Sequence, residues 1–185
     1  AYTVSVTAKD SNSAKTKAAT ITITVQYPKL TLNGNGGTVT TAAVYPKYAT
    51  ASEYTAATGS TAATIGATRT GYTLNGWYTA TSGGSKVLDA SGNGTGTAVT
   101  NFTNASKNWV MTANQTLYAH WTANSYTISF DANGGNTPNP TNKQVTYDST
   151  YESLPTVNRE GYTFAGWYTS ASGGNKVTSS TTVKI

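Results

Sequence analysis

The 185-residue chain contains no cysteine, one histidine and one methionine, and only 10% of its residues are charged. The absence of cysteine excludes disulfides and thiolate metal sites, and a single histidine argues against catalysis that depends on imidazole. Leu, Ile, Val and Phe are also scarce, at about 14% of the residues, a share that indicates disorder only when the net charge is high. Thirteen Tyr and four Trp supply large apolar side chains instead. We therefore expect a folded chain that is not an enzyme.

Two further deficits limit the partners that we expect. No apolar run approaches the roughly 18–20 residues that a membrane span requires, and residues 1–4 lack the basic head and apolar core of a signal peptide. The 12 Lys and Arg residues are scattered, and only Arg69 and Arg159 are arginines. Nucleic-acid binders concentrate such cations on one face, so we expect no nucleic-acid partner.

The chain is rich in residues that favour strands and turns. Ser and Thr make up about 30% of the sequence, and 18 Gly are present. Thr and Tyr favour strands, whereas Gly favours turns. This composition predicts a β-rich fold.

The sequence repeats itself. Residues 71–87 (GYTLNGWYTATSGGSKV) and 161–177 (GYTFAGWYTSASGGNKV) match over most positions, and 30–37 (LTLNGNGG) corresponds to 128–135 (ISFDANGG). We predict module 1 at 29–124 and module 2 at 125–185.

The two predicted modules differ at their ends. Residues 114–121 of module 1 alternate between apolar and polar, as a closing strand does, and module 2 stops before any counterpart. Module 2 is therefore expected to lack its last strand in this chain. Module 1 also contains an insert at 89–113, of which only 108–111 looks capable of packing.

Residues 1–28 match neither module. Two alternating segments, 2–7 and 19–25, flank a turn-like stretch and predict a β-hairpin. This hairpin resembles the end of a bacterial immunoglobulin-like or cadherin-like domain.

Within module 2 the sequence predicts strands at 126–130, 143–147 and 164–169. One helical turn is expected at 156–160, capped by the glycine that follows it. The aromatic side chains of the third strand and of the residues just before it are expected to face the core, namely Tyr162, Phe164 and Trp167.

The pattern of a strand with Gly-Gly, then Gly-Tyr-Thr-Phe-x-Gly-Trp-Tyr-Thr, Gly-Gly-x-Lys-Val and Thr-Leu-Tyr-Ala-x-Trp resembles the Listeria–Bacteroides repeat of internalin-type bacterial surface proteins. The resemblance covers about 29–185. It implies a β-rich α+β fold of tandem small β-grasp (ubiquitin-like) modules, here preceded by the β-hairpin of an immunoglobulin-like sandwich. The residues that carry the motif are Gly71, Tyr72, Gly76, Trp77, Gly161, Tyr162, Phe164, Gly166 and Trp167.

Candidate sites are few. Aromatic residues at Tyr78, Tyr168 and Trp109 could contact a glycan or protein ligand, although a chain poor in Leu and Ile also needs aromatics in its core. The loops at Asp89 and Asp131 faintly resemble calcium loops, but each has one carboxylate where calcium usually requires several. We expect turns there, and no metal, cofactor or catalytic residue.

These features predict a non-enzymatic structural or adhesive region of a bacterial surface or secreted protein, acting as an extracellular stalk or spacer. One alternative is a module that binds a cell-wall or host glycan or a host protein. Another is a subunit of an extracellular filament that assembles by strand complementation, through the open sheet edges. The expected partners are neighbouring repeats of the same polypeptide, such a glycan or protein, or further copies of the chain.

Overall fold

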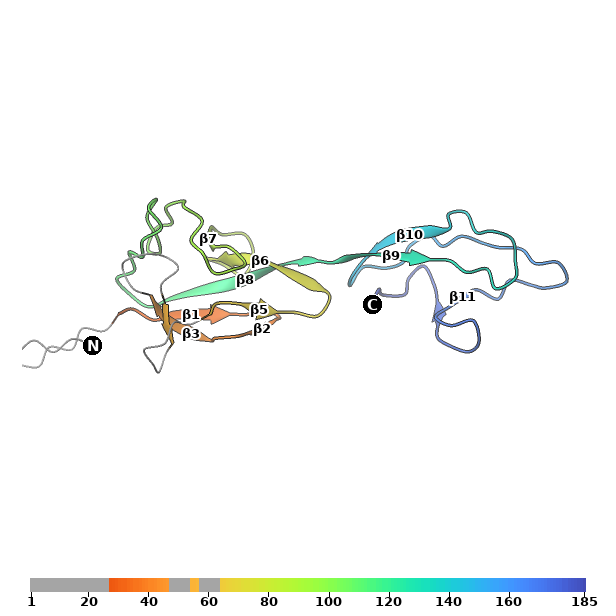
Figure 1. Ribbon diagram of the computed structural model, residues 1–185, viewed down its shortest axis with the longest axis horizontal. Helices are drawn as coiled ribbons and strands as arrows, with labels where there is room; N and C mark the ends of the chain where they lie inside the picture. The colour runs from red at the N-terminus through yellow and green to blue at the C-terminus, as the bar shows by residue number, and fades with distance from the viewer. Residues whose placement is uncertain (1–26, 47–53, 57–63) are drawn as a thin grey trace, which may run out of the picture. The chain divides into compact units, whose positions relative to one another are not determined.

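The computed structural model of the protein describes residues 27–46, 54–56 and 64–185. These residues form β-strands and no helix (Figure 1). The β-rich class is therefore confirmed, whereas the helical part of the expected α+β class is not found in the described residues. The predicted hairpin at 1–28 lies outside them, apart from residues 27 and 28.

The strands of the described residues are short, and most of the longer ones come from module 1. They are β1 (Leu30–Asn33), β2 (Thr38–Val39), β3 (Ala43–Pro46), β4 (Tyr54–Ala56), β5 (Ala67–Thr68), β6 (Tyr72–Tyr78), β7 (Lys86–Leu88), β8 (Gln115–Ala123), β9 (Ser125–Ser129), β10 (Asn142–Thr146), β11 (Trp167–Tyr168) and β12 (Lys176–Val177).

Contacts divide the chain into two compact units. Unit 1 comprises residues 1–35, 39–66 and 76–119, and unit 2 comprises residues 36–38, 67–75 and 120–185. Unit 2 therefore contains the whole of the predicted module 2 together with short segments of module 1. The predicted module boundaries themselves stay a prediction.

The largest sheet has the order β4-β3-β1-β8-β6-β7, and Figure 1 labels all of its strands except β4. Its first strand β1 pairs antiparallel with β3 and parallel with β8, with Leu32 opposite Leu117. The alternation that predicts the closing strand is visible in β8, where Leu117 and Ala119 are fully buried. Because alternate residues of a strand face the same side, these two side chains share one face of the sheet.

The insert of module 1 contributes more to the core than expected. Trp109 and Met111, at its predicted packing end, are buried, but so are Val99 and Phe102. Thr103 connects the two parts through bridges to Val99 and Trp109. The expectation that only 108–111 packs is therefore wrong, because a Thr-rich loop can fold back as short paired segments.

Module 2 contains two separate hairpins in the described structure. β9 pairs with β10 and β11 pairs with β12, each as a two-stranded sheet. The first two strands lie close to the predicted 126–130 and 143–147. The third, predicted at 164–169, is reduced to Trp167–Tyr168.

The predicted helical turn at 156–160 is not formed. Its backbone groups pair with distant residues instead: the Asn158 amide donates to Asn136 Oδ1 at 2.5 Å, and the Asn136 amide donates to Asn158 O at 2.9 Å. The preceding Pro155 accepts a bond from Trp167 Nε1 at 2.7 Å. These long-range bonds use backbone groups that a helical turn would need, so the segment contains no helix.

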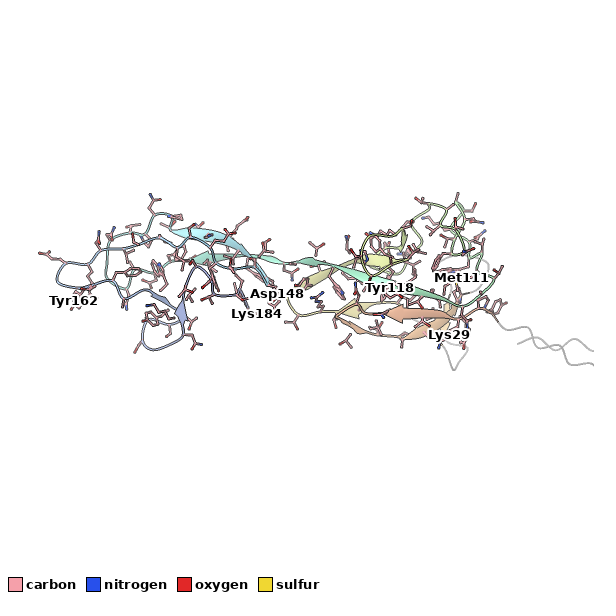
Figure 2. All side chains as sticks on the ribbon, turned by 180° about the vertical axis from the view of Figure 1, so that it is seen from behind. Lys29, Met111, Tyr118, Asp148, Tyr162 and Lys184 are labelled. Atoms are coloured by element: carbon pink, nitrogen blue, oxygen red, sulfur yellow. The ribbon has the colours of Figure 1, made fainter. Side chains whose placement is uncertain are left out.

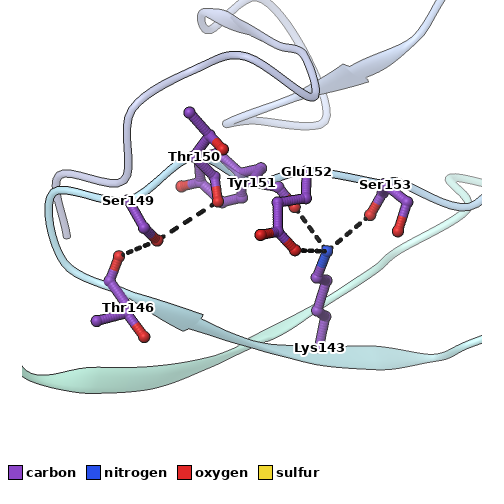
Figure 3. A network of polar contacts seen from close by, with 7 residues as sticks. All are labelled: Lys143, Thr146, Ser149, Thr150, Tyr151, Glu152 and Ser153. Carbon is purple, nitrogen blue, oxygen red and sulfur yellow. Dashed lines mark hydrogen bonds and ion pairs between the residues drawn. The ribbon is translucent and has the colours of Figure 1, made fainter.

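Lys143 of β10 binds the backbone of residues 151–153, just before Pro155. Its Nζ donates to Tyr151 O at 2.6 Å and to Ser153 O at 2.9 Å, and lies 3.9 Å from Glu152 Oε2 (Figure 3). Because one ammonium binds two carbonyls of the same segment, that segment is kept beside β10. The exposed Glu152 carboxylate adds little, since surface ion pairs stabilise weakly.

Candidate functional site

Unit 2 contains a groove of about 520 Å³ with aromatic walls. Phe130 and Trp167 have ring centroids 4.9 Å apart, and Phe164 meets Trp167 edge to face at 5.5 Å. Ile128 of β9 and Tyr168 of β11 also line it. We call this the aromatic groove, and it lies between the β9 and β11 hairpins.

Two aromatics expected in the core lie at the surface instead. Tyr162 is 67% exposed and Phe164 is 38% exposed, so the prediction that they face a core is wrong. Trp167 is half-buried, with its ring nitrogen bonded to Pro155. In module 1 the corresponding strand β6 lies beside β8. In the described part of module 2, β11 pairs with β12 alone.

Equivalent positions of the two modules differ in burial accordingly. Four apolar side chains of module 1 are at most 3% exposed, and they are Leu30, Leu32, Trp77 and Val87. Their counterparts in module 2 are all half-buried, and they are Ile128, Phe130, Trp167 and Val177. The same trend holds for the motif tyrosines, since Tyr72 and Tyr78 are half-buried and their counterparts Tyr162 and Tyr168 are exposed.

The three predicted ligand aromatics occupy different environments. Tyr168 is 44% exposed and lines the aromatic groove. Tyr78 is half-buried on β6, and Trp109 is buried in the core of unit 1. The structure does not bring these three side chains together into one site.

A second cluster in unit 2 joins residues of both predicted modules. The Tyr72 hydroxyl donates to Asp148 Oδ2 at 2.6 Å. Lys184 Nζ donates to Asp148 Oδ1, and both of these residues are labelled in Figure 2. Tyr72 also meets the Tyr147 ring edge to face at 5.6 Å and lies under the Arg69 guanidinium, 3.8 Å from its ring centroid. We call these five residues the junction cluster.

The charges of the junction cluster stabilise one another. Two hydrogen bonds hold the pKa of Asp148 below its usual value. The bond from Lys184 has the larger effect, and the bond from Tyr72 the smaller. The bond to Asp148 raises the pKa of Tyr72, and the same carboxylate raises the pKa of Lys184. The cluster is therefore most favourable with Asp148 ionised, Tyr72 neutral and Lys184 protonated.

Backbone groups complete this junction. Asn124, the single residue between β8 and β9, donates its amide to Gly71 O at 2.9 Å and accepts from the Tyr147 amide at 2.9 Å. Its side-chain Oδ1 accepts from Thr73 Oγ1 at 2.6 Å. Gly71 has a φ of 76°, and a Cβ there would overlap the Tyr147 ring. At the equivalent Gly161, with a φ of 75°, a Cβ would meet nothing within 4 Å.

The junction cluster escaped the sequence analysis, although one signal pointed to part of it. The two arginines of the chain lie at equivalent positions, each three residues before a motif tyrosine. Arg159 stacks on Tyr162 at 4.2 Å, as Arg69 does on Tyr72. Asp148 has no counterpart in module 1, so the repeat pattern carries no sign of it.

The loops that resemble calcium sites are turns held by their own carboxylates. Asp89 Oδ1 accepts from the amides of Ser91 at 2.9 Å and Asn93 at 2.8 Å. Asp131 Oδ1 accepts from the Asn133 amide at 2.9 Å. Among the described residues, no group of three or more His, Cys, Asp or Glu side chains could hold a metal ion. No helix in those ranges is long and apolar enough to cross a membrane.

The model of one protein family, the Listeria-Bacteroides repeat domain, matches residues 29–100 and 126–185. One matched segment lies within each predicted module, and the first ends at residue 100, before the predicted end of module 1 at 124. The two segments include β1, the Gly-Tyr-Thr motifs and the aromatic groove.

Curated relatives are much longer proteins. Internalin H of Listeria monocytogenes is 37% identical over 109 residues, which cover 59% of this chain and 16% of that protein. A Gly-rich membrane protein of Evansella cellulosilytica is 34% identical over 110 residues, covering 57% of this chain and 11% of that protein. The chain thus spans less than a fifth of the length of either relative. No solved structure matches it significantly.

Proposed function

The chain belongs to the Listeria-Bacteroides repeat domain family, and from this premise we propose that it is a non-enzymatic spacer within an extracellular bacterial surface protein. Its modules would hold other domains of the same polypeptide at a set distance from the cell. The neighbouring repeats and domains of that polypeptide are then its main partners.

The observation that carries this proposal is the bonding between successive modules. A single residue, Asn124, separates β8 from β9, and its amide, carbonyl and side chain are all bonded. Tyr72 of module 1 is bonded in turn to Asp148 of module 2. Direct bonding of this kind supports a spacer, whereas domains that only need tethering are commonly joined by flexible linkers.

The β-grasp arrangement is part of the same proposal. In the largest sheet the first strand of module 1, β1, and its closing strand, β8, are parallel neighbours, with β3 and β6 flanking them. Such a mixed sheet, with parallel central strands and antiparallel hairpins at both sides, supports the arrangement that the family resemblance implies.

Display on a bacterial surface tests the spacer role. The 185-residue chain is inserted, in one, two or three copies, between a wall anchor and a small tip domain that binds a bead-bound ligand. Bead capture should rise with copy number when long surface polymers shield the cell, and should not change on cells without them. Capture that is independent of copy number on shielded cells would contradict the proposal.

A binding role is the second candidate, favoured by the exposed aromatics of unit 2. Tyr168 and Tyr162 present 44% and 67% of their surface, and aromatic rings are suited to stacking on sugars or to anchoring a protein ligand. A glycan array with the purified chain tests it, with Tyr168→Ala as the variant that should lose binding. Tyr78→Ala, at the equivalent half-buried position, is the matched control.

A further inference from the structure

We propose that a polar pocket beside the junction cluster binds the phosphate group of a small hydroxylated ester, such as a polyol phosphate. The pocket has a volume of about 510 Å³, and all of its lining residues belong to unit 2. Small-molecule sites have volumes of about 300–1,000 Å³, so this pocket has room for a ligand larger than an inorganic anion. A phosphate site here would be independent of the spacer role, since a spacer needs no ligand.

Segments of both predicted modules line the pocket. Module 1 contributes residues 36–38, residues 68–70 and Tyr72, whereas module 2 contributes Tyr147, Asp148 and Lys184. A cation lies over each tyrosine ring. The Arg69 guanidinium is 3.8 Å from the centroid of Tyr72, and Lys184 Nζ is 4.9 Å from the centroid of Tyr147. The walls therefore offer cations and threonine hydroxyls, which suit a ligand that is both anionic and hydroxylated.

Arg69 is the group best placed to hold the anion. Its guanidinium is half-buried, stacks on Tyr72, and lies 3.4 Å from where a Cβ on Gly36 would be. These contacts keep the guanidinium in place, yet it donates no hydrogen bond to any residue in the described ranges. Because a guanidinium carries five N–H donors in a rigid planar fork, these donors remain for a ligand.

The equivalent arginine of module 2 has a partner within the protein. Arg159 stacks on Tyr162 at 4.2 Å in the same way, but its Nη1 donates to Asn133 O at 3.1 Å. The next residue is Glu160, whereas the equivalent residue in module 1 is Thr70. A carboxylate at that position would repel an anion. Only the arginine of module 1 therefore combines unused donors with an uncharged neighbour.

The charge of the pocket also favours an anion. Arg69 and Lys184 are cations, and Asp148 is the single acid among the lining residues. Both oxygens of Asp148 already accept hydrogen bonds, one from Tyr72 and one from Lys184. Two cations thus face one carboxylate, and a positive charge remains for the ligand.

The arrangement of the donors favours phosphate over carboxylate. The guanidinium, the Lys184 ammonium and the hydroxyls of Thr38 and Thr68 come from different segments of the chain. A phosphate group presents three acceptor oxygens that point in different directions, whereas a carboxylate presents two in one plane. Arginine also binds phosphate through two parallel hydrogen bonds. The threonine hydroxyls and the remaining volume then suit the hydroxylated part of an ester.

Glycerol 3-phosphate is the probe, titrated into the isotopically labelled 185-residue chain at pH 7.5 and followed by NMR. We expect a saturable shift of the Arg69 Nε–H signal, whereas the Arg159 Nε–H signal should change little. Inorganic phosphate, which lacks the polyol, should bind at least fivefold more weakly. Glycerate, in which a carboxylate replaces the phosphate group, should bind at least tenfold more weakly, and glycerol should not bind.

Matched variants locate the site. Arg69→Gln should weaken binding at least tenfold, whereas Arg159→Gln should change it less than twofold. Thr70→Glu introduces the acid that module 2 carries at the equivalent position, and it should also weaken binding at least tenfold. Thr70 is exposed, so this variant should fold even if Arg69→Gln does not. Thr70→Gln has the same size without the charge and should stay within threefold of the wild type.

Several results would overturn the proposal. One is the absence of a saturable shift at Arg69 Nε–H with glycerol 3-phosphate. Another is an equal loss of binding in Arg69→Gln and Arg159→Gln, or unchanged binding in Thr70→Glu. Glycerate that binds as tightly as glycerol 3-phosphate would refute the preference for phosphate, and inorganic phosphate that does so would refute the ester.

Discussion

Gly71 and Gly161 form a matched pair that tests whether the junction cluster packs as described. The two glycines have the same role in the repeat and nearly the same φ, 76° and 75°. Alanine in the left-handed region costs about 1–2 kcal/mol at either position. At Gly71 the new Cβ would also overlap the Tyr147 ring, whereas at Gly161 it would meet nothing within 4 Å.

The expected costs therefore differ by the packing contribution alone. Forcing an extra methyl into a packed contact typically costs a further 1–3 kcal/mol or so. We expect Gly161→Ala to destabilise unit 2 by about 1–2 kcal/mol and Gly71→Ala by about 2–5 kcal/mol. In a Tyr147→Ala background the ring is absent, and the cost of Gly71→Ala should fall to that of Gly161→Ala.

Native-state hydrogen exchange is the suitable assay, because it reports the opening free energy of unit 2 separately from that of unit 1. Amides of β9 and β10, which pair over five residues each, provide the probes. Equal costs for the two alanine variants, or a Gly71→Ala cost that Tyr147→Ala leaves unchanged, would refute the packing of Gly71 against Tyr147.

Other perturbations test the charges and the core. Lowering the pH from about 6 to about 2 should destabilise unit 2, because folding lowers the pKa of Asp148. The stabilisation contributed by the ionised carboxylate is complete above the unfolded pKa of about 3.9 and is lost as the pH falls through the folded pKa. Hydrogen exchange checks this, and Asp148→Asn should remove that part of the pH dependence. Raising the pH above about 10 should also destabilise the unit, because folding raises the pKa values of Tyr72 and Lys184. The stabilisation contributed by the protonated forms is lost as the pH rises through the folded pKa values. Tyr72→Phe should weaken this loss of stability at alkaline pH. Trp77→Ala should cost about 3–5 kcal/mol in urea unfolding because Trp77 is fully buried, and the half-buried Trp167→Ala should cost less than half of that; equal costs would contradict the difference between the modules.

Local sequence signals predicted local structure well. The Asn-Gly-Gly turns form because Asn35 and Asn133 adopt positive φ angles and bond the preceding polar side chains, as turn chemistry suggests. The alternation at 114–121 predicted β8, whose buried residues match the apolar positions. Each of these features depends on a few neighbouring residues, so the sequence contains the information needed to find it.

Features that depend on distant segments were predicted poorly. The segment that contains Tyr162 and Phe164 alternates as a strand does. Its side chains are buried only where other parts of the fold pack against them. The segment 156–160 has a helical pattern, but Asn136 competes for its backbone groups from 22 residues away. Asp148 and Lys184 are 36 residues apart and unrelated by the repeat, so only the folded chain brings them together.

The parallel pairing of β1 with β8 has a mechanical consequence. Module 1 begins its sheet at Leu30 of β1 and leaves it at Ala123 of β8, and the two strands run in the same direction over four paired residues. Tension applied to the two ends of the module would drag β1 and β8 in opposite directions along each other. The evenly spaced bonds of this parallel ladder would then carry the load in shear, all at once, rather than open one after another. The fold thus places its resistance to stretching between its first and last strands.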